Sequence, residues 1–171
     1  MYSKKVLITG YATCGKSSLV NRFVHNRFLH SYSADNQLKV DKKEVTINKK
    51  SINLVCWTVP GKELKIKSFR SFYLGTDALV HVVDVNNPST FVDVHDWILH
   101  YRKHLPSTPV YLACNKIEDN VDLDMTNYFD DIDCYKIFFT SAKNSFMVKN
   151  LFTSIAADLV NEDYNHTIKV Y

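Results

Sequence analysis

Residues 10–17 read GYATCGKS, a run whose residue types and spacing can hold a polyphosphate. The two glycines, Gly10 and Gly15, allow the backbone to curl so that its N–H groups point inward at phosphate oxygens. Lys16 supplies a full positive charge to the β- and γ-phosphates, and the hydroxyl of Ser17 is a ligand for Mg²⁺. This G-x-x-x-x-G-K-[ST] pattern predicts a site for a nucleoside triphosphate with Mg²⁺. The other loop residues expected at the phosphates are Ala12, Thr13, Cys14 and Ser18.

Such a loop must lie between a strand and a helix, and the flanking residues predict both. Residues 6–8 form a short apolar run before Gly10, as in a buried strand. After the loop, apolar residues recur at helical spacing, namely Leu19, Val20, Phe23 and Val24. A helix that begins near Lys16 adds its N-terminal partial positive charge to the site. The alternative is that the two glycines occur by chance in an ordinary turn. That alternative does not explain why the loop lies between a predicted strand and a predicted helix.

The rest of the chain alternates short apolar runs with amphipathic helical patterns. Two alternating segments, 45–47 and 52–56, flank a polar turn and predict a hairpin. The other expected strands are 78–85, 109–113 and 135–139, and the other expected helices are 87–105 and 146–160. Strands separated by helices predict an α/β fold: a six-stranded, mostly parallel sheet with one antiparallel hairpin, flanked by about five helices.

Length and composition limit what this chain can be. Its 171 residues suit a single domain, residues 1–171, and 46% hydrophobic with 23% charged residues is typical of a soluble globular protein. The apolar runs are too short to span a bilayer, and a net charge of +3 is too weak to indicate nucleic acid as a partner. The four cysteines form no C-x-x-C pair, so we expect free thiols in a reducing compartment. We expect His81, within an apolar run, to be a core or interface histidine and not a ligand.

Two further polar segments follow predicted strands. Residues 115–118 read NKIE, and residues 140–143 read TSAK. Open α/β sheets bind ligands outside the carboxyl ends of their strands. Both segments are therefore expected at the same edge of the sheet as the phosphate loop, where they can bind the base of a nucleotide. Taken alone, NKIE is explained equally well by a polar turn.

With these three loops in place, the sequence resembles the small GTPases of the Ras superfamily and is most similar to their Rab branch. That family carries N-K-x-D and S-A-K as guanine-binding loops. Further residues that match the Rab pattern are Trp57, Gly61-Lys62-Glu63, Phe72-Tyr73, Asp84-Val85 and Phe91. The resemblance implies a small-GTPase-type P-loop fold, GTP or GDP with Mg²⁺ as cofactors, and a regulatory switch function in vesicle traffic or signalling.

The resemblance also implies a role for each base-binding residue. Asn115 would brace the loops, Lys116 would lie over the guanine ring, and Glu118 would accept from the guanine N1–H and N2 amine. Ala142 would offer its backbone N–H to the guanine O6, and Lys143 would pack against the base. Other nucleotide contacts that the family pattern implies are Phe28 at the guanine edge, Gly61 at the γ-phosphate, and Ser141.

The departures from the family pattern cluster around the γ-phosphate. The family's magnesium-binding threonine is replaced by Asp35, its D-x-x-G aspartate by Thr58, and its catalytic glutamine by Lys62. Two roles stay open for Asp35: a direct Mg²⁺ ligand, or a group that repels the γ-phosphate. A charged lysine has three donors and no acceptor, so Lys62 cannot orient the attacking water. We therefore expect an impaired catalytic position at Lys62, and GTP hydrolysis that is very slow or absent.

The resemblance implies protein effectors and exchange factors as partners, bound through the segment from Asp35 to Val40, Trp57 and the segment from Lys62 to Tyr73. The chain ends without a cysteine, so we expect no lipid anchor on it. We expect a cytoplasmic protein that reaches membranes through partners or through sequence beyond this chain. Two alternatives stay open: a pseudo-GTPase scaffold that acts through protein contacts without nucleotide switching, and a P-loop phosphotransferase. The second lacks an arginine-rich lid and leaves NKIE and TSAK unexplained.

Overall fold

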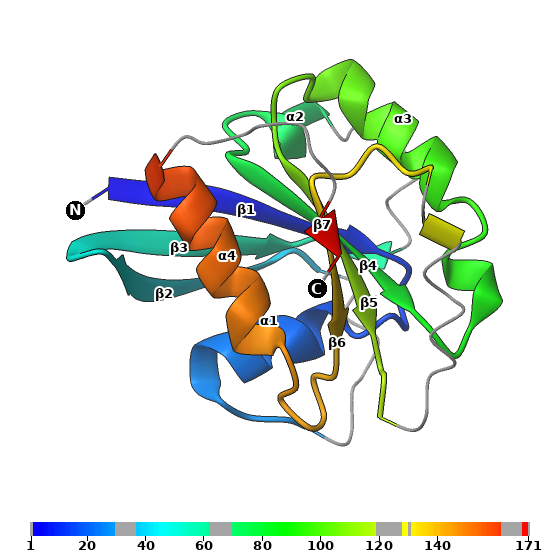
Figure 1. Cartoon of the computed structure of the whole chain (residues 1–171), viewed down its shortest axis with the longest axis horizontal. Helices are drawn as coiled ribbons and strands as arrows, with labels where there is room; N and C mark the ends of the chain where they lie inside the picture. Colours follow the sequence, from blue (N-terminus) through cyan, green and yellow to red (C-terminus); the bar gives the residue numbers. More distant parts are fainter. Residues whose placement is uncertain are drawn as a thin grey trace.

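A seven-stranded sheet forms the centre of the molecule, in the order β2-β3-β1-β4-β5-β6-β7, with helices on both faces (Figure 1). The computed structural model describes residues 2–29, 37–61, 70–118, 128–129, 131–161 and 169–170. β2 runs antiparallel to β3, and every other neighbouring pair of strands is parallel. The predicted α/β fold, with a mostly parallel sheet and one hairpin, is confirmed.

The strands are β1 (Tyr2–Gly10), β2 (Lys39–Ile47), β3 (Lys50–Thr58), β4 (Ala78–Asp84), β5 (Val110–Asn115), β6 (Lys136–Thr140) and β7 (Lys169–Val170). Six of them are the predicted strands, and the two-residue β7, which pairs with β6, is an addition that the sequence did not indicate. The turn between β2 and β3 has Asn48 and Lys49 at positive φ, 47° and 66°. A two-residue turn with both residues at positive φ has a backbone twist that matches the twist of the two strands it joins, as a tight hairpin requires.

Within the part of the chain that the structure describes, the helices are α1 (Lys16–His25), α2 (Arg70–Tyr73), α3 (Val94–His104), α4 (Val148–Asn161) and a 3-10 helix (Pro88–Thr90). The sequence predicts about five helices, and the described residues form four α-helices and one 3-10 helix. The helix expected from residue 87 begins as the 3-10 helix, and α3 starts only at Val94. The reason is local, because Phe91 leaves the helical region with a φ of −129°.

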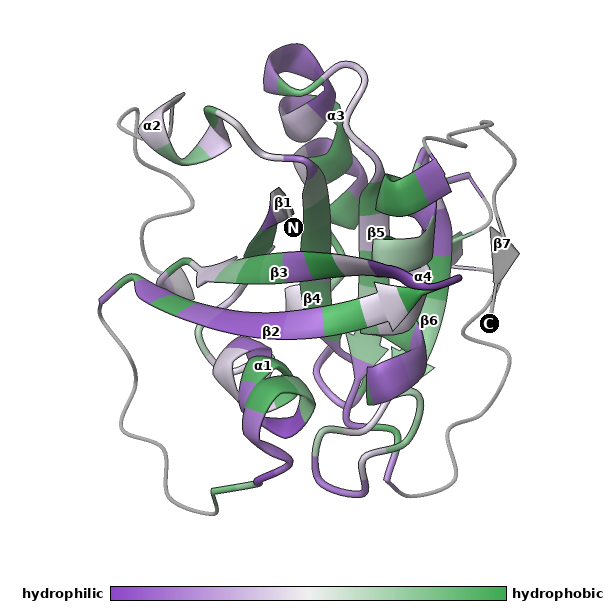
Figure 2. Ribbon diagram, turned by 90° about the vertical axis from the view of Figure 1, so that its left-hand side faces the viewer, coloured by the Kyte–Doolittle hydropathy of each residue, from purple (hydrophilic) through white to green (hydrophobic). Residues whose placement is uncertain are grey.

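The helices enclose an apolar core on each face of the sheet. α1 and α4 pack together on one face, where the rings of Phe23 and Phe152 stack with centroids 4.1 Å apart. α3 covers the other face with Trp97 and Ile98. Figure 2 shows α1 below the sheet, α2 and α3 above it, and a largely hydrophilic edge strand β2. Because both faces are covered, every residue of β4 and β5 is buried, which explains their continuous apolar runs.

Two predictions from the sequence are confirmed, the core position of His81 and the free thiols of the cysteines. His81 is fully buried in β4. The four cysteines, Cys14, Cys56, Cys114 and Cys134, are free and buried. None of the helices among the described residues is long and apolar enough to cross a membrane.

The parallel strands end at one edge of the sheet. Asp84 at the end of β4 pairs with Asn115 at the end of β5, which in turn pairs with Thr140 at the end of β6. On the other side, Ile8 of β1 pairs with Thr58 at the end of β3. This edge therefore gathers the loops that follow β1, β3, β4, β5 and β6, among them the phosphate loop and both polar segments.

Candidate functional site

A cavity of about 350 Å³ opens at this edge of the sheet. The predicted contacts that line it are Ala12, Thr13, Gly15, Lys16, Ser17, Ser18, Phe28, Gly61, Asn115, Lys116, Glu118 and Ala142. Leu29, Gln37, Thr58, Val59 and Pro60 line it as well, although the sequence did not indicate them as contacts. The fold brings the phosphate loop and both polar segments together around one space.

Two glycines of the phosphate loop lie where no side chain fits. Gly15 has a φ of 88°, and a Cβ there would lie 2.4 Å from Nδ2 of Asn115. Gly10 has a φ of 129°, and a Cβ there would lie 2.2 Å from the carbonyl oxygen of Val82 in β4. Positive φ and a close approach of the backbone both require glycine. The loop can therefore curl tightly against the ends of β4 and β5.

Lys16, the first residue of α1, holds its amine inside the phosphate loop. Its Nζ donates to the carbonyl oxygens of Gly10 at 2.9 Å and Tyr11 at 2.7 Å. Only 5% of the residue is exposed, and this burial lowers the pKa of the amine to about 8. A poorly solvated ammonium beside a helix N-terminus gains from an anionic partner. This end of the cavity therefore has the chemistry of a phosphate site.

Asn115 links the phosphate loop to the loop after β6. Its Nδ2 donates to the carbonyl oxygen of Cys14 at 2.9 Å. Its Oδ1 accepts from the N–H of Ala142 at 3.2 Å and from the hydroxyl of Thr140 at 3.3 Å. Asn115 is 1% exposed, and buried polar groups of this kind need their partners. Its side chain thus holds two walls of the cavity at a fixed distance.

Glu118 is held at the other end of the cavity by Ser141. The Ser141 hydroxyl donates to Oε1 of Glu118 at 3.1 Å and accepts from the N–H of Asn144 at 3.0 Å. Ser141 is buried and does not line the cavity, so it acts on the cavity through Glu118. A carboxylate held in this way can accept from two adjacent N–H donors, which guanine presents on its N1 and N2.

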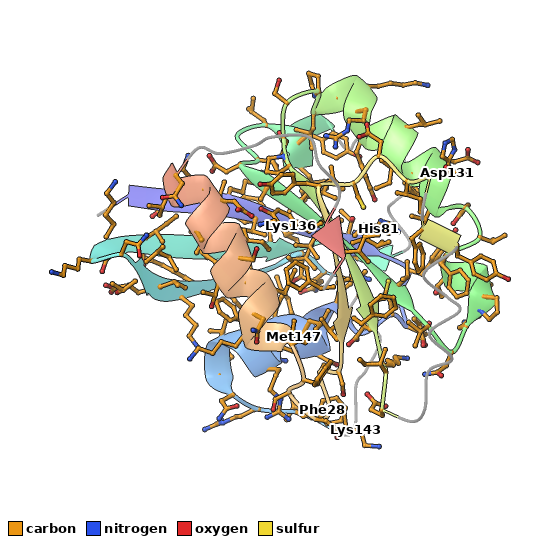
Figure 3. The ribbon with its side chains drawn as sticks, viewed as in Figure 1. Phe28, His81, Asp131, Lys136, Lys143 and Met147 are labelled. Carbon is orange, nitrogen blue, oxygen red and sulfur yellow. The ribbon has the colours of Figure 1, made fainter. Side chains whose placement is uncertain are left out.

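Cys14 and Lys143 are predicted nucleotide contacts within the described residues, and neither lines the cavity. The side chain of Cys14, a residue of the phosphate loop, is buried in the core, and Lys143 is exposed, with its carbonyl oxygen accepting from Arg22 at 2.9 Å. Figure 3 shows Lys143 and Phe28 at the same end of the molecule, on the loops after β6 and α1. Asp35 and Lys62 lie outside the described residues.

Within the described part of the chain, the side-chain oxygens that line the cavity near Lys16 include two hydroxyls that could bind a metal. Ser17 and Thr58 both line the cavity. Thr58 is 4% exposed, and its Oγ1 has no partner among the described groups. Residues 2–29, 37–61 and the other described ranges contain no group of three His, Cys, Asp or Glu side chains that could hold a metal. Ser17 and Thr58 fit a Mg²⁺ that takes most of its ligands from phosphates and water.

Comparison with known proteins shows the family of this chain. A family model described as the Ras family matches residues 5–161. The chain belongs to the Ras family. The match covers the phosphate loop, both polar segments and every helix of the described chain.

Relatives within the Ras family are Rab and Ypt proteins. The Ypt/Rab-type GTPase YPT7 of Saccharomyces cerevisiae is 29% identical, over 97% of this chain and 90% of its own length. The Ras-related protein Rab7 of Drosophila melanogaster is 31% identical, over 70% of this chain and 58% of its own length. The Ras-related protein Rab-1C of Dictyostelium discoideum is 28% identical, over 91% of this chain and 80% of its own length. The similarity to the Rab branch that the motifs indicated is confirmed.

Sequence reasoning missed Asp84, the last residue of β4, and Asn86 in the loop after it, both of which contact Lys116. Asp84 accepts from Nζ of Lys116 at 2.7 Å, and Nδ2 of Asn86 donates to the carbonyl oxygen of Lys116 at 2.9 Å. The Rab pattern includes Asp84 as a matching residue and implies no role for it at the base. The signal that could have found both residues is their position at the carboxyl end of a parallel strand, where such sheets bind ligands.

Proposed function

We propose that this Rab-like protein binds GDP or GTP with Mg²⁺ and acts as a regulatory switch in vesicle traffic or signalling. The observation that carries the proposal is the bridge made by Asn115, which joins the phosphate loop to the loop after β6 around one cavity. Lys16 supplies positive charge at one end of this cavity, and Glu118 supplies acceptors at the other. This arrangement supports a phosphorylated nucleoside with guanine as its base.

We further propose that GTP hydrolysis is very slow or absent. At the end of β3, Thr58 offers a neutral hydroxyl where the family has a carboxylate, so Mg²⁺ is held less strongly. Lys62, which lies outside the described residues, cannot accept a hydrogen bond from the attacking water while it is charged. Intact sites of this type turn over at only about 10⁻⁴–10⁻³ per second without an activator. Loss of the water-orienting group should lower this rate by roughly one to two orders of magnitude, or about 1.4–2.8 kcal/mol of barrier.

The proposed partners are protein effectors and exchange factors that contact the hairpin of β2 and β3. Val40 in β2 is 51% exposed, and it pairs with Trp57 of β3 across the hairpin. Val40 and Trp57, two of the residues through which the Rab resemblance implies partner contact, are thus neighbours on the hairpin. A cytoplasmic location, with membrane contact through such partners, belongs to the same proposal.

The proposal is tested first by the nucleotide that copurifies with the full chain. Chromatography of the extract should show GDP or GTP, and excess GTP should displace labelled GDP while excess ATP does not. A chain that carries no nucleotide and takes up no added GDP would favour the pseudo-GTPase scaffold. ATP or AMP in the extract would favour a phosphotransferase.

A matched pair of lysine variants then tests the cavity. Lys16→Ala removes the buried ammonium and should weaken GDP binding about 10- to 100-fold. Lys149→Ala removes an exposed lysine of α4 and should leave GDP binding unchanged. Equal affinities in the two variants would contradict the site.

Single-turnover hydrolysis of preloaded GTP tests the catalytic part of the proposal. The wild-type rate should fall below that of intact sites, and Lys62→Gln alone should restore little, because Thr58 remains. A wild-type rate in the range of intact sites, lost in Lys62→Ala, would show that Lys62 promotes hydrolysis.

A further inference from the structure

Lys116 is paired with a buried carboxylate at the end of the neighbouring strand. Its Nζ lies 2.7 Å from Oδ2 of Asp84, where the Asp84 side chain is 9% exposed and that of Lys116 is 34% exposed. The other oxygen of Asp84, Oδ1, accepts from the N–H of Asn86 at 3.0 Å. Both oxygens of this carboxylate therefore have partners. Its charge is compensated by a lysine that lies 32 positions further along the sequence.

The backbone around Lys116 is held by residues that directly follow β4. Its φ of 71° lies in the left-handed region, which is unfavourable for a residue with a Cβ. Nδ2 of Asn86 donates to the carbonyl oxygen of Lys116 at 2.9 Å. One residue earlier, the carbonyl oxygen of Asn115 accepts from the N–H of Val85 at 3.1 Å. The end of β4 and the loop after it thus fix both the main chain and the side chain of Lys116.

This pairing matters for the cavity, because Lys116 lines it and Asp84 does not. A lysine stem whose amine is tied to a buried carboxylate is already ordered. When a flat ring packs against such a stem, the stem loses little further rotamer freedom, whereas an untied lysine would lose much of it on binding. The ion pair therefore prepares an apolar wall in advance of the ligand.

We infer that Asp84 is a positioning residue for the base, that it acts through Lys116, and that Asn86 supports it. The inference rests on the proposed binding of a guanine nucleotide. It gives a specific expectation, which is that Asp84 contributes to the binding of ligands that carry a base and not to the binding of phosphates alone.

The test is a double-mutant cycle in the full chain, read by the dissociation constant of labelled GDP. Asp84→Ala and Lys116→Ala should each weaken GDP binding about 10-fold. Since Asp84 acts through Lys116, adding Asp84→Ala to Lys116→Ala should cost less than about twofold more. Asp133→Ala is the matched control, because it breaks the exposed pair with Arg102, and it should leave GDP binding unchanged.

Two further readouts separate positioning from damage to the fold. Inorganic pyrophosphate has no base, so it should compete for the phosphate loop equally well in the wild type and in Asp84→Ala. Asp84→Asn keeps the shape of the side chain and an acceptor oxygen, and it should lose less GDP affinity than Asp84→Ala. If Asp84→Ala does not fold, Asp84→Asn serves the same comparison, with a loss of about threefold for GDP and none for pyrophosphate.

Additive losses in the cycle would overturn the inference, because Asp84 would then not act through Lys116. Equal losses for GDP and pyrophosphate would also overturn it, because Asp84 would then act on the fold or on the phosphate loop. Unchanged GDP affinity in Asp84→Ala would overturn it as well. These outcomes leave the proposed function intact. A wild-type chain that binds no guanine nucleotide would overturn the proposed function and this inference with it.

Discussion

The free energy of unfolding of this protein should fall as the pH falls, and replacing His81 by glutamine should make that fall smaller. His81 lies fully buried in β4, toward the centre of the molecule (Figure 3). Its Nδ1 lies 2.8 Å from the hydroxyl of Tyr101, and its Nε2 has no partner among the described groups. Burial lowers the pKa of His81 to about 3. Of the smaller effects, that of Asp93 raises the pKa and that of Lys16 lowers it further. The folded protein therefore keeps this imidazole neutral at pH values where the unfolded chain would protonate it.

The sign and the size of the effect follow from proton linkage. The pKa of His81 is about 3 in the folded protein and ordinarily 6.5, so the unfolded chain binds one more proton between these values. The stability contributed by neutral His81 is complete above about pH 6.5 and is lost as the pH falls toward 3. Each pH unit in this window costs about 1.4 kcal/mol. Acidification from pH 7.5 to pH 5 should therefore cost about 2 kcal/mol through this one residue.

Urea unfolding of the nucleotide-free chain at these two pH values measures the effect. Other groups titrate too, so the readout is the difference in pH dependence between the wild type and His81→Gln, about 2 kcal/mol. His95→Gln is the control, because the side chain of His95 is 62% exposed, and it should keep the wild-type pH dependence. The same pH dependence in the wild type and in His81→Gln would refute the reasoning, since the imidazole would then not be held neutral by the fold.

Asn115→Ala removes the bridge between the cavity walls and leaves buried groups on both sides without a partner. It should weaken GDP binding about 100-fold in an equilibrium titration, and a loss below threefold would contradict the bridging role. Gly61→Ala places a Cβ 2.2 Å from the backbone of the phosphate loop, so bound GTP should dissociate about 10-fold faster. Lys136→Met removes the partner of Asp158, 2.7 Å away in a mostly buried pair, and should cost about 3–5 kcal/mol in urea unfolding. Lys4→Met breaks a more exposed pair and should cost at most about 1 kcal/mol, so equal costs would contradict the role of burial.

Local sequence was sufficient to predict the phosphate loop. Gly10, Gly15, Lys16 and Ser17 lie within eight consecutive residues, and a curled loop depends on the backbone freedom of its own residues and on the elements at its two ends. The same holds for the order of strands and helices, because the spacing of apolar residues reports which face each element buries. The spacing of apolar residues along the chain therefore predicted most of the fold, and one eight-residue motif predicted the loop around Lys16.

The end of the cavity at Asn115 and Glu118 was predictable only through motifs, and its geometry was not. The sequence suggested Asn115 and Glu118 because they follow an apolar strand and match a known family pattern. It did not show that Ser141 holds Glu118, or that the hydroxyl of Thr58 lies buried at the cavity without a partner. These facts depend on how the loops pack against one another.

Only the tertiary structure decided which groups meet across the strand ends. Asp84 and Lys116 belong to no common motif, and they meet because β4 and β5 are neighbours in a register that pairs Asp84 with Asn115. The two-residue β7 is a similar case, since so short a strand exists through its pairing with β6 and not through a pattern of its own. An ion pair or a strand pairing depends on distance in space, whereas residue spacing along a chain reports only the local backbone. For this reason the sequence predicted the elements, and the packed sheet determined how Lys116 is presented to the cavity.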